Sequence, residues 1–169
     1  MLDPVNYSST GFTVEIWIKL NSTAPPPASS SQFQYLMSKF LDDGSKGLFL
    51  RRNSSKKIVF GVKWGGVVTS AASDPVEAGS GWHQVVGTLK GTNLNLYVDQ
   101  QNFSASNPAG VFPTTETDKS VKIGDGPYSS GFLPATVDSV AFYRTALASP
   151  CEVGRHYDVR TQETPRGCS

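Results

Sequence analysis

The sequence has little of several residue types and patterns, and each shortage excludes a class of protein. Its 169 residues include two cysteines and two histidines, and the net charge is +1. Such a balance provides no overall field for nucleic acid or an anionic membrane. No run of about 18 apolar residues occurs, so we expect no membrane insertion. The start, MLDPVNYSST, lacks the basic and apolar regions of a signal peptide. We therefore expect any secreted form to be a mature piece or an excised domain of a larger protein.

The two cysteines, Cys151 and Cys168, lie close to the C-terminus. A disulfide between them would close a loop of about 17 residues and contribute roughly 3 kcal/mol in the chain-entropy model. Because both lie in one polar terminal segment, the sequence favours pairing. Two free thiols are the alternative.

Four Asn-x-Ser/Thr triplets begin at Asn6, Asn21, Asn53 and Asn102. Such triplets are acceptors for N-glycosylation in the secretory route, and all four fall in predicted loops or at strand ends. They give weak support to an extracellular or cell-surface protein.

The dominant pattern is the alternation of apolar and polar residues. In FTVEIWIKL, residues 12–20, every second residue is apolar, which predicts a strand with one face in a core. Alternation or short apolar runs mark further predicted strands at 34–40, 47–52, 57–63, 67–72, 82–89 and 93–99, near Phe103, and at 121–124 and 135–143. Many short strands separated by Gly, Pro and Ser turns predict an all-β sandwich or barrel. We expect one domain over 1–169, with its core at about 11–147.

One helix is predicted, in the tail 148–169. Ser149 suits the N-cap, Pro150 the first helical position, and Glu152 follows three residues after the cap. These signals predict a short helix over about 150–157.

The order of the motifs resembles the laminin G-like domains of the concanavalin A-like lectin and glucanase superfamily. The likeness is carried by FTVEIWIKL, YLMSKF, GLFLRR, KIVFGV, GWHQVVGTLKGTNLNLYVD, VKIGDG and ATVDSVAFYRTAL, over residues 11–147. It implies two antiparallel sheets in a jelly roll that binds carbohydrates, sulfated glycans or extracellular proteins. Family members usually carry a strand before the FTVEIW-like one. Here either MLDPVNY is its remnant or another segment covers that sheet edge.

Enzymatic activity is not expected. Glucanases of related fold need two carboxylates, yet no E-x-D-x-E run occurs, and Glu15 and Asp138 each stand alone on their strands. His83 shares the strand face of Val85 and Leu89, and the sequence shows no nucleophile motif to serve it. We therefore expect His83 to be part of the scaffold.

The resemblance implies a calcium site, because laminin G-like domains often hold one ion at the sandwich rim through oxygen ligands. The candidates are Asp42 and Asp43, which precede the strand GLFL, and Asp125 between two glycines. Lys46 and Gly47 stand directly before GLFL, so the usual ligand position is shifted or lost. The alternative is that these aspartates only form turns.

Aromatic and cationic residues provide the candidates for ligand contact. Sugar rings pack on aromatic faces, and Trp64 and Tyr128 both fall in predicted loops. Trp17 lies on the polar side of its strand, where it either lines a sheet face or packs under a loop.

A hairpin rich in cations joins two predicted strands. Arg51 and Arg52 end one strand, Lys56 and Lys57 begin the next, and Lys63 follows on it. These side chains suit sulfate or carboxylate groups. Neighbours on a strand point to opposite faces, however, so about half of them can face one ligand. The alternative is a solvated hairpin.

The sequence thus predicts a non-catalytic extracellular binding module, with rim loops that contact carbohydrate around an optional calcium ion. The alternative is a protein–protein interaction or structural module of a larger secreted or cell-surface protein, which would use exposed sheet faces or loops. The expected partners are carbohydrates or glycosylated or extracellular proteins.

Overall fold

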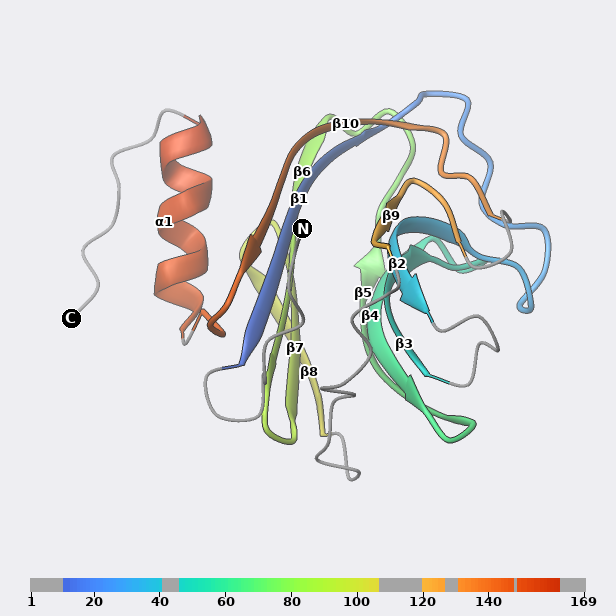
Figure 1. The fold of residues 1–169 in the computed structure, drawn as a ribbon. Coiled ribbons are helices and arrows are strands. Elements are labelled where there is room, and N and C mark those ends of the chain that lie inside the picture. The colour runs from blue at the N-terminus through green and yellow to red at the C-terminus, as the bar shows by residue number, and fades with distance from the viewer. Residues whose placement is uncertain (1–10, 41–45, 107–119, 127–130, 148, 162–169) are drawn as a thin grey trace.

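The computed structural model describes residues 11–40, 46–106, 120–126, 131–147 and 149–161, which form two sheets and one helix (Figure 1). The elements are β1 (Phe12–Leu20), β2 (Gln34–Phe40), β3 (Gly47–Arg52), β4 (Lys57–Trp64), β5 (Val67–Pro75), β6 (Trp82–Lys90), β7 (Asn93–Val98), β8 (Gln101–Ser106), β9 (Lys122–Ile123), β10 (Ala135–Tyr143) and α1 (Pro150–Thr161). Four predicted strands, at 12–20, 34–40, 47–52 and 135–143, have the predicted bounds.

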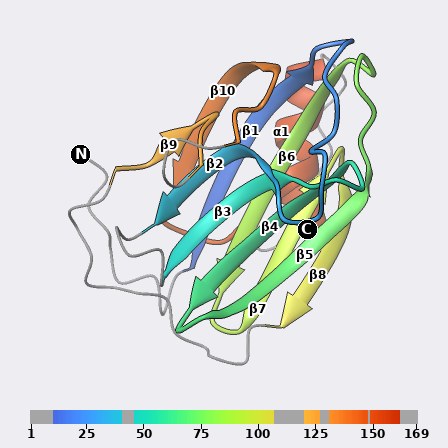
Figure 2. The same ribbon diagram turned by 90° about the vertical axis from the view of Figure 1, so that its right-hand side faces the viewer.

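Two antiparallel sheets face each other. Sheet A has the strand order β10-β1-β6-β7-β8, and sheet B has the order β5-β4-β3-β2-β9. Figure 1 shows the sheets as separate layers, and Figure 2 looks onto the outer face of sheet B. Edge strand β5 of sheet B contacts β7 and β8 of sheet A, which closes the sandwich on that side. The predicted all-β, two-sheet sandwich is confirmed.

The core lies between the sheets and uses the apolar side of the alternating pattern. Val14, Ile16 and Ile18 of β1 are fully buried, as are Leu50 and Phe60 of sheet B. Each such side chain contributes roughly 1.5–3 kcal/mol on burial.

One glycine allows a close approach of the two sheets. A Cβ at Gly87 would lie 2.6 Å from the ring of Phe60. A larger residue at position 87 would therefore push against the centre of the core.

Helix α1 covers the outer face of sheet A (Figure 1). Its start is as predicted, because the Glu152 backbone N–H donates to Ser149 Oγ at 3.3 Å. The helix continues to Thr161, beyond the predicted end at 157. Val153 is fully buried against Val86 and Tyr97 of the sheet.

The helix changes which strand faces are buried. Trp17 of β1 stacks on Tyr157 of α1 with ring centroids 5.6 Å apart, and Glu15 and Thr13 on the same face are also buried. Tyr97, on the polar side of β7, is buried as well. The predicted strand at 12–20 with one face in the core is confirmed, and the helix buries its other face as well. The pattern of one strand does not reveal a helix packed on its other side.

Candidate functional site

The structure separates the predicted ligand residues. Trp64 ends β4 at the β4–β5 hairpin, where the Lys46 ammonium lies 4.2 Å from its ring centroid. Lys57 begins the same strand, about 23 Å away at the spacing of extended residues. Arg51 and Arg52 lie at the Lys57 end of the sheet. Tyr128 lies outside the described residues. No single ligand of small size can contact Trp64 and the cationic hairpin together.

The two arginines point to opposite faces of sheet B, as the alternation predicted. Arg52 faces inward and is fully buried. Its guanidinium donates to the carbonyls of Pro25 and Val76 and to Gln34 Oε1. This position corrects the expectation that Arg52 contacts a ligand, because the side chain binds two loops to the sheet. Burial lowers the pKa of Arg52.

Arg51 points outward into a cluster of aromatic rings. Its guanidinium lies 3.4 Å from the ring centroid of Phe33 and 4.1 Å from that of Phe49, and it donates to the Tyr35 hydroxyl at 3.5 Å. Burial lowers the pKa of Arg51, and the hydrogen bond to Tyr35 partly offsets this. The arginine that was predicted to bind a ligand is thus largely held by its own chain.

The predicted calcium residues are only partly described. Asp42 and Asp43 lie outside the described residues. Asp125 accepts a hydrogen bond from the Gly126 N–H at 2.7 Å, and its other carboxylate oxygen lies 3.6 Å from the Lys122 ammonium. A cation of the chain itself therefore already neutralises Asp125. Within the described ranges, no three His, Cys, Asp or Glu side chains gather closely enough to hold a metal.

The predicted modification sites also fall partly outside the described residues. Cys151 lies in the first turn of α1, and the described part of the chain has no free cysteine, but Cys168 lies outside it. The pairing of the two stays a prediction. Asn21 and Asn102 are exposed. Asn53 accepts hydrogen bonds from the backbones of Ser55 and Lys57, and Asn6 is not described.

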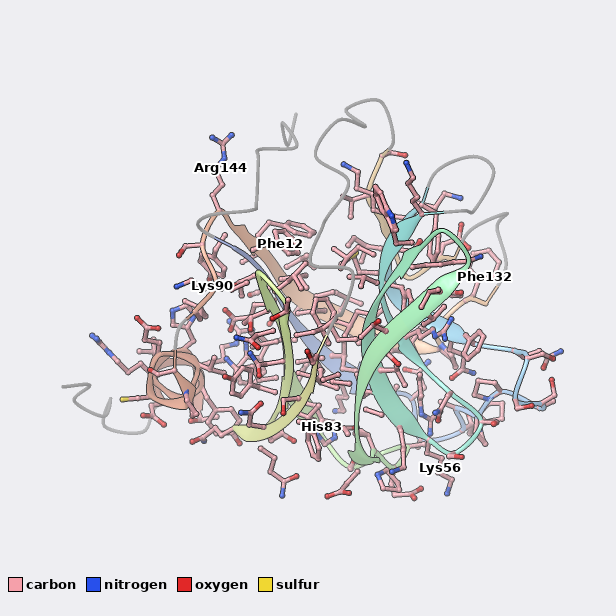
Figure 3. All side chains as sticks on the ribbon, turned by 90° about the horizontal axis from the view of Figure 1, so that it is seen from below. Phe12, Lys56, His83, Lys90, Phe132 and Arg144 are labelled. Atoms are coloured by element: carbon pink, nitrogen blue, oxygen red, sulfur yellow. The ribbon has the colours of Figure 1, made fainter. Side chains whose placement is uncertain are left out.

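A cleft lies at the sandwich end that holds the β3–β4 turn and the β7–β8 turn. Figure 3 shows His83 and Lys56 together at this end, away from Phe12 and Lys90. The cleft, here called the rim cleft, has a volume of about 240 Å³. It is lined by Ser73, Asp74, Pro75, Val76, Glu77, Ser80, His83, Val98, Asp99 and Gln101.

His83 has two side-chain partners in the rim cleft. Its Nδ1 lies 2.6 Å from Asp99 Oδ2, and its Nε2 lies 2.7 Å from Ser80 Oγ. The second carboxylate oxygen of Asp99 accepts the Gln84 N–H, which fixes the carboxylate beside β6. The His83 side chain is 14% exposed and faces the lining of the rim cleft. The sequence shows no motif that joins His83 to a serine or an acid, and the structure brings both to its ring from other segments.

Although these residues match the members of a hydrolytic triad, the serine proton is used elsewhere. Ser80 Oγ donates to the Glu77 carbonyl at 2.5 Å. A hydroxyl has one proton, so in this arrangement His83 Nε2 must donate to Ser80 and cannot accept its proton. A general base needs a free lone pair facing the nucleophile, which this geometry does not offer.

Two other side chains of the rim cleft are free to meet a ligand. Among the described residues, neither the Asp74 carboxylate nor the Gln101 amide has a hydrogen-bond partner, and both residues are exposed. Ser73, by contrast, is buried and bonds to the backbones of Ile58 and Asp74. The cleft therefore combines polar groups that are paired within the chain with two exposed polar side chains that are not.

A second cavity, of about 500 Å³, lies between α1 and sheet A. Its lining residues are Glu15, Trp17, Ser139, Ala141, Tyr143, His156, Val159 and Arg160. We call it the helix groove. Arg160 forms an ion pair with Asp138 of β10.

Glu15 is the centre of the helix groove, and its carboxylate is saturated. Oε1 accepts from Gln84 Nε2 at 2.8 Å and Trp17 Nε1 at 3.3 Å. Oε2 accepts from His156 Nδ1 at 2.8 Å and the Tyr143 hydroxyl at 3.1 Å. Burial first, and then the charge of Glu15, raises the pKa of Tyr143 to about 12. These polar groups anchor the helix to the sheet, which leaves few for a ligand.

Sequence reasoning missed the rim cleft because its walls come from distant segments. Asp74, Glu77 and Ser80 lie in and after β5, whereas Asp99 and Gln101 belong to the β7–β8 turn and the start of β8. No motif joins them. The single available signal was the histidine at the start of a strand, and the structure alone places its partners.

The comparisons with known proteins agree with the fold. A family model described as the concanavalin A-like lectin/glucanases superfamily, in its laminin G form, matches residues 2–153. No curated protein sequence matches the chain.

Three similar solved structures come from different kinds of protein. A Trypanosoma rangeli sialidase is 20% identical with a TM-score of 0.64, and the match covers 92% of this chain and 24% of the sialidase. A SAP-like pentraxin from Limulus polyphemus is 15% identical with a TM-score of 0.58, covering 87% of this chain and 69% of the pentraxin. Domains LG4-5 of the mouse laminin alpha1 chain are 15% identical with a TM-score of 0.59, and the match covers 85% of this chain and 39% of the laminin chain. At these identities the likeness shows the fold alone.

Proposed function

The chain belongs to the concanavalin A-like lectin/glucanases superfamily, and on that premise we propose that it is a non-catalytic module that binds carbohydrate in the rim cleft. The observation that carries the proposal is that two exposed polar side chains of the cleft, those of Asp74 and Gln101, have no partner among the described residues and can bond to a ligand. Ligand sites typically combine a concave surface with a few convergent polar groups. The cleft lies below the usual range of about 300–1,000 Å³ for small-molecule pockets, which suits one sugar ring.

The similar structures support a binding role in a coarse sense only. They include a sialidase, a pentraxin and laminin domains, so the same sandwich serves several different proteins. Fold does not determine function, and the proposal therefore rests on the cleft. The absence of catalysis is proposed because, when the Ser80–Glu77, Ser80–His83 and His83–Asp99 hydrogen bonds are all formed, the Ser80 proton is directed to a backbone carbonyl.

An extracellular location is part of the proposal. It is supported by the family, by the exposed sequons at Asn21 and Asn102, and by the cysteines near the C-terminus. No helix in the described part of the chain is long and apolar enough to cross a membrane. Calcium stays a proposal for Asp42 and Asp43, and a chelation experiment addresses it.

The test is a glycan array probed with the unmodified chain, once with calcium and once with a chelator. We expect binding to a set of glycans that share a terminal ring. Gln101→Ala should weaken this binding about tenfold, the effect of one lost hydrogen-bond partner. The matched control is Asn102→Ala, because Asn102 is the next residue on β8 and points to the opposite face.

A second pair of variants tests whether the negative charge matters in the rim cleft itself or anywhere on the protein surface. Asp74→Asn should weaken binding, whereas Asp138→Asn, an acid in the helix groove region, should leave it unchanged. No binding in either calcium condition, or equal losses for Gln101→Ala and Asn102→Ala, would contradict the proposal. Loss of binding with the chelator alone would support the calcium site.

A protein–protein role is the second candidate, and one observation favours it. The β4–β5 hairpin exposes apolar side chains, with Val67 63% and Val68 47% exposed beside Trp64. Val67 is the cross-strand partner of Trp64, so these two side chains share one face of the hairpin, and exposed apolar side chains that lie together mark interaction sites. If the array shows no bound glycan, a partner protein should be captured from extracellular fluid by the wild type. Loss of this capture in the double variant Val67→Ser/Val68→Ser would favour the protein–protein role.

A further inference from the structure

The rim cleft contains three linked hydrogen bonds, and the number of protons that they require can be compared with the number that the groups carry. Ser80 Oγ bonds to the Glu77 carbonyl and to His83 Nε2, and His83 Nδ1 bonds to Asp99 Oδ2. We call the three side chains Ser80, His83 and Asp99 the latch. Each bond needs one proton, so the complete latch needs three.

The ordinary states of these groups supply only two protons. The Ser80 hydroxyl carries one, a neutral imidazole carries one, and an ionised carboxylate carries none. The Glu77 carbonyl can only accept. The third proton must therefore come from solvent. The complete latch then has either a doubly protonated His83 beside an ionised Asp99, or a neutral His83 beside a protonated Asp99.

We propose that the rim cleft is a proton-gated binding site. When the latch takes up one proton, all three hydrogen bonds form and the two walls of the cleft are held in the arrangement that binds the ligand. This inference rests on the proposed function, since it concerns regulation of the same site. Without the extra proton one of the three bonds must be lost. Histidine side chains in general change charge between pH 5 and 8, so this is the pH range in which the gate is tested.

The latch connects two walls of the cleft that come from separate segments. Ser80 lies in the connection between β5 and β6, here called the rim loop, residues 76–81. Asp99 lies in the turn between β7 and β8, with a positive φ of 47°. His83, at the start of β6, stands between them. Closing the latch therefore fixes the distance between the two walls.

The rim loop is attached mainly at its start, where Val76 is buried in the core, the Val76 carbonyl accepts a hydrogen bond from Arg52, and Glu77 pairs with Lys56. Val76 N–H donates to the Lys56 carbonyl at 3.0 Å, and Gly79 N–H donates to the Leu20 carbonyl at 3.3 Å. Gly79 and Gly81 flank Ser80 with φ of 76° and 105°, a region that glycine enters readily. The loop can thus change conformation around Ser80 while its start stays attached.

Three carboxylates and one lysine lie around the latch. Asp74, Glu77 and Asp99 line the cleft with His83, and Lys56 pairs with Glu77 at 2.8 Å on the solvent side. The cleft therefore holds three carboxylates and one pairing cation.

Linkage sets the direction of the effect on ligand binding. A ligand that bridges the two walls binds the closed form better, so it promotes proton uptake, and protons promote its binding to the same extent. Affinity should therefore rise as pH falls from 8 to 5.5, by on the order of tenfold.

The first experiment needs no ligand. Backbone amide NMR of the rim loop is recorded from pH 5 to 8 in the His156→Gln variant, which leaves His83 as the sole histidine. The amides of Gly79, Ser80 and Gly81 should shift together with the His83 ring signals. In Ser80→Ala the ring should still titrate while the loop amides no longer follow it. Ser80→Thr, which keeps the hydroxyl, should restore the coupling.

The second experiment measures glycan affinity over the same pH range. Wild type and Ser80→Thr should bind more tightly at low pH, and Ser80→Ala should bind with little dependence on pH. The gate would be disproved if the loop amide shifts did not follow the His83 ring signals, or if the glycan affinity of Ser80→Ala depended on pH as that of the wild type does. Coupled loop amides with no glycan bound at any pH would instead support the latch and sink the carbohydrate proposal.

Discussion

At the scale of single residues, burial decides which polar groups serve structure. Glu15 lies on the polar side of β1, yet it is buried and accepts four hydrogen bonds under α1. An ionised carboxylate inside a protein is tolerated only when its oxygens are satisfied in this way. Tyr143 provides one of these bonds, and its pKa of about 12 follows from burial and from the negative charge it faces.

Tyr143→Phe should therefore lower the free energy of unfolding by about 2 kcal/mol at neutral pH, since a buried bond to a charged acceptor is lost. A raised folded-state pKa means that the contribution of Tyr143 is complete below its ordinary value of 10.0 and fades as the pH rises toward about 12. Denaturant unfolding of both proteins at pH 8 to 12 measures this. The difference between them should shrink only above pH 10, and a constant difference would disprove the assignment.

At the scale of elements, α1 turns sheet A into the middle layer of the molecule. Val153 packs against the sheet, Trp17 stacks on Tyr157, and the Arg160–Asp138 ion pair joins the helix to β10. The polar face of sheet A is thereby removed from solvent over β1 and β7. A helix of this length gains its stability mainly from such packing, because short isolated helices are marginal in water.

Two tryptophans provide a matched test of this packing. Trp17 is 5% exposed under α1, whereas Trp82 of β6 is 43% exposed. Trp17→Ala should destabilise the protein by about 3–5 kcal/mol and reduce helical signal in circular dichroism. Trp82→Ala should cost less than about 1 kcal/mol. Equal losses in thermal unfolding would show that the helix contributes little to the fold.

At the scale of the whole molecule, one core unites both sheets. The main hydrophobic cluster contains residues of β1, β6 and β7 from sheet A and of β2, β3 and β4 from sheet B. The side chains interdigitate, so neither sheet can keep its apolar face buried alone. The sandwich should therefore behave as one cooperative unit.

Equilibrium unfolding in urea should accordingly show one transition. Tryptophan fluorescence, which includes the helix contact of Trp17, should coincide with the strand signal in circular dichroism. Refolding should take milliseconds to seconds, because sandwich pairings join distant segments. Two separated transitions would argue against a single core and for a helix that detaches first.

How much was predictable differs between the fold and the site. Alternation along single strands located β1, β2, β3 and β10 correctly, because register on a half-buried strand is visible in a local pattern. The orientation of Arg51 and Arg52 followed from the same rule. By contrast, the proposed ligand set of Trp64 with Arg51 and Lys57 does not converge on one surface. Alternation shows on which face of a strand a side chain lies, but it does not show at which end of the sheet that residue is placed.

The sequence by itself determined the all-β class and the start of the helix, since each depends on neighbours within a few residues. Only the tertiary structure decided that α1 buries Glu15 and Trp17. It alone brought Ser80 and Asp99 to the two ring nitrogens of His83. These contacts join segments from separate turns, and only the pairing and packing of the strands sets such distances.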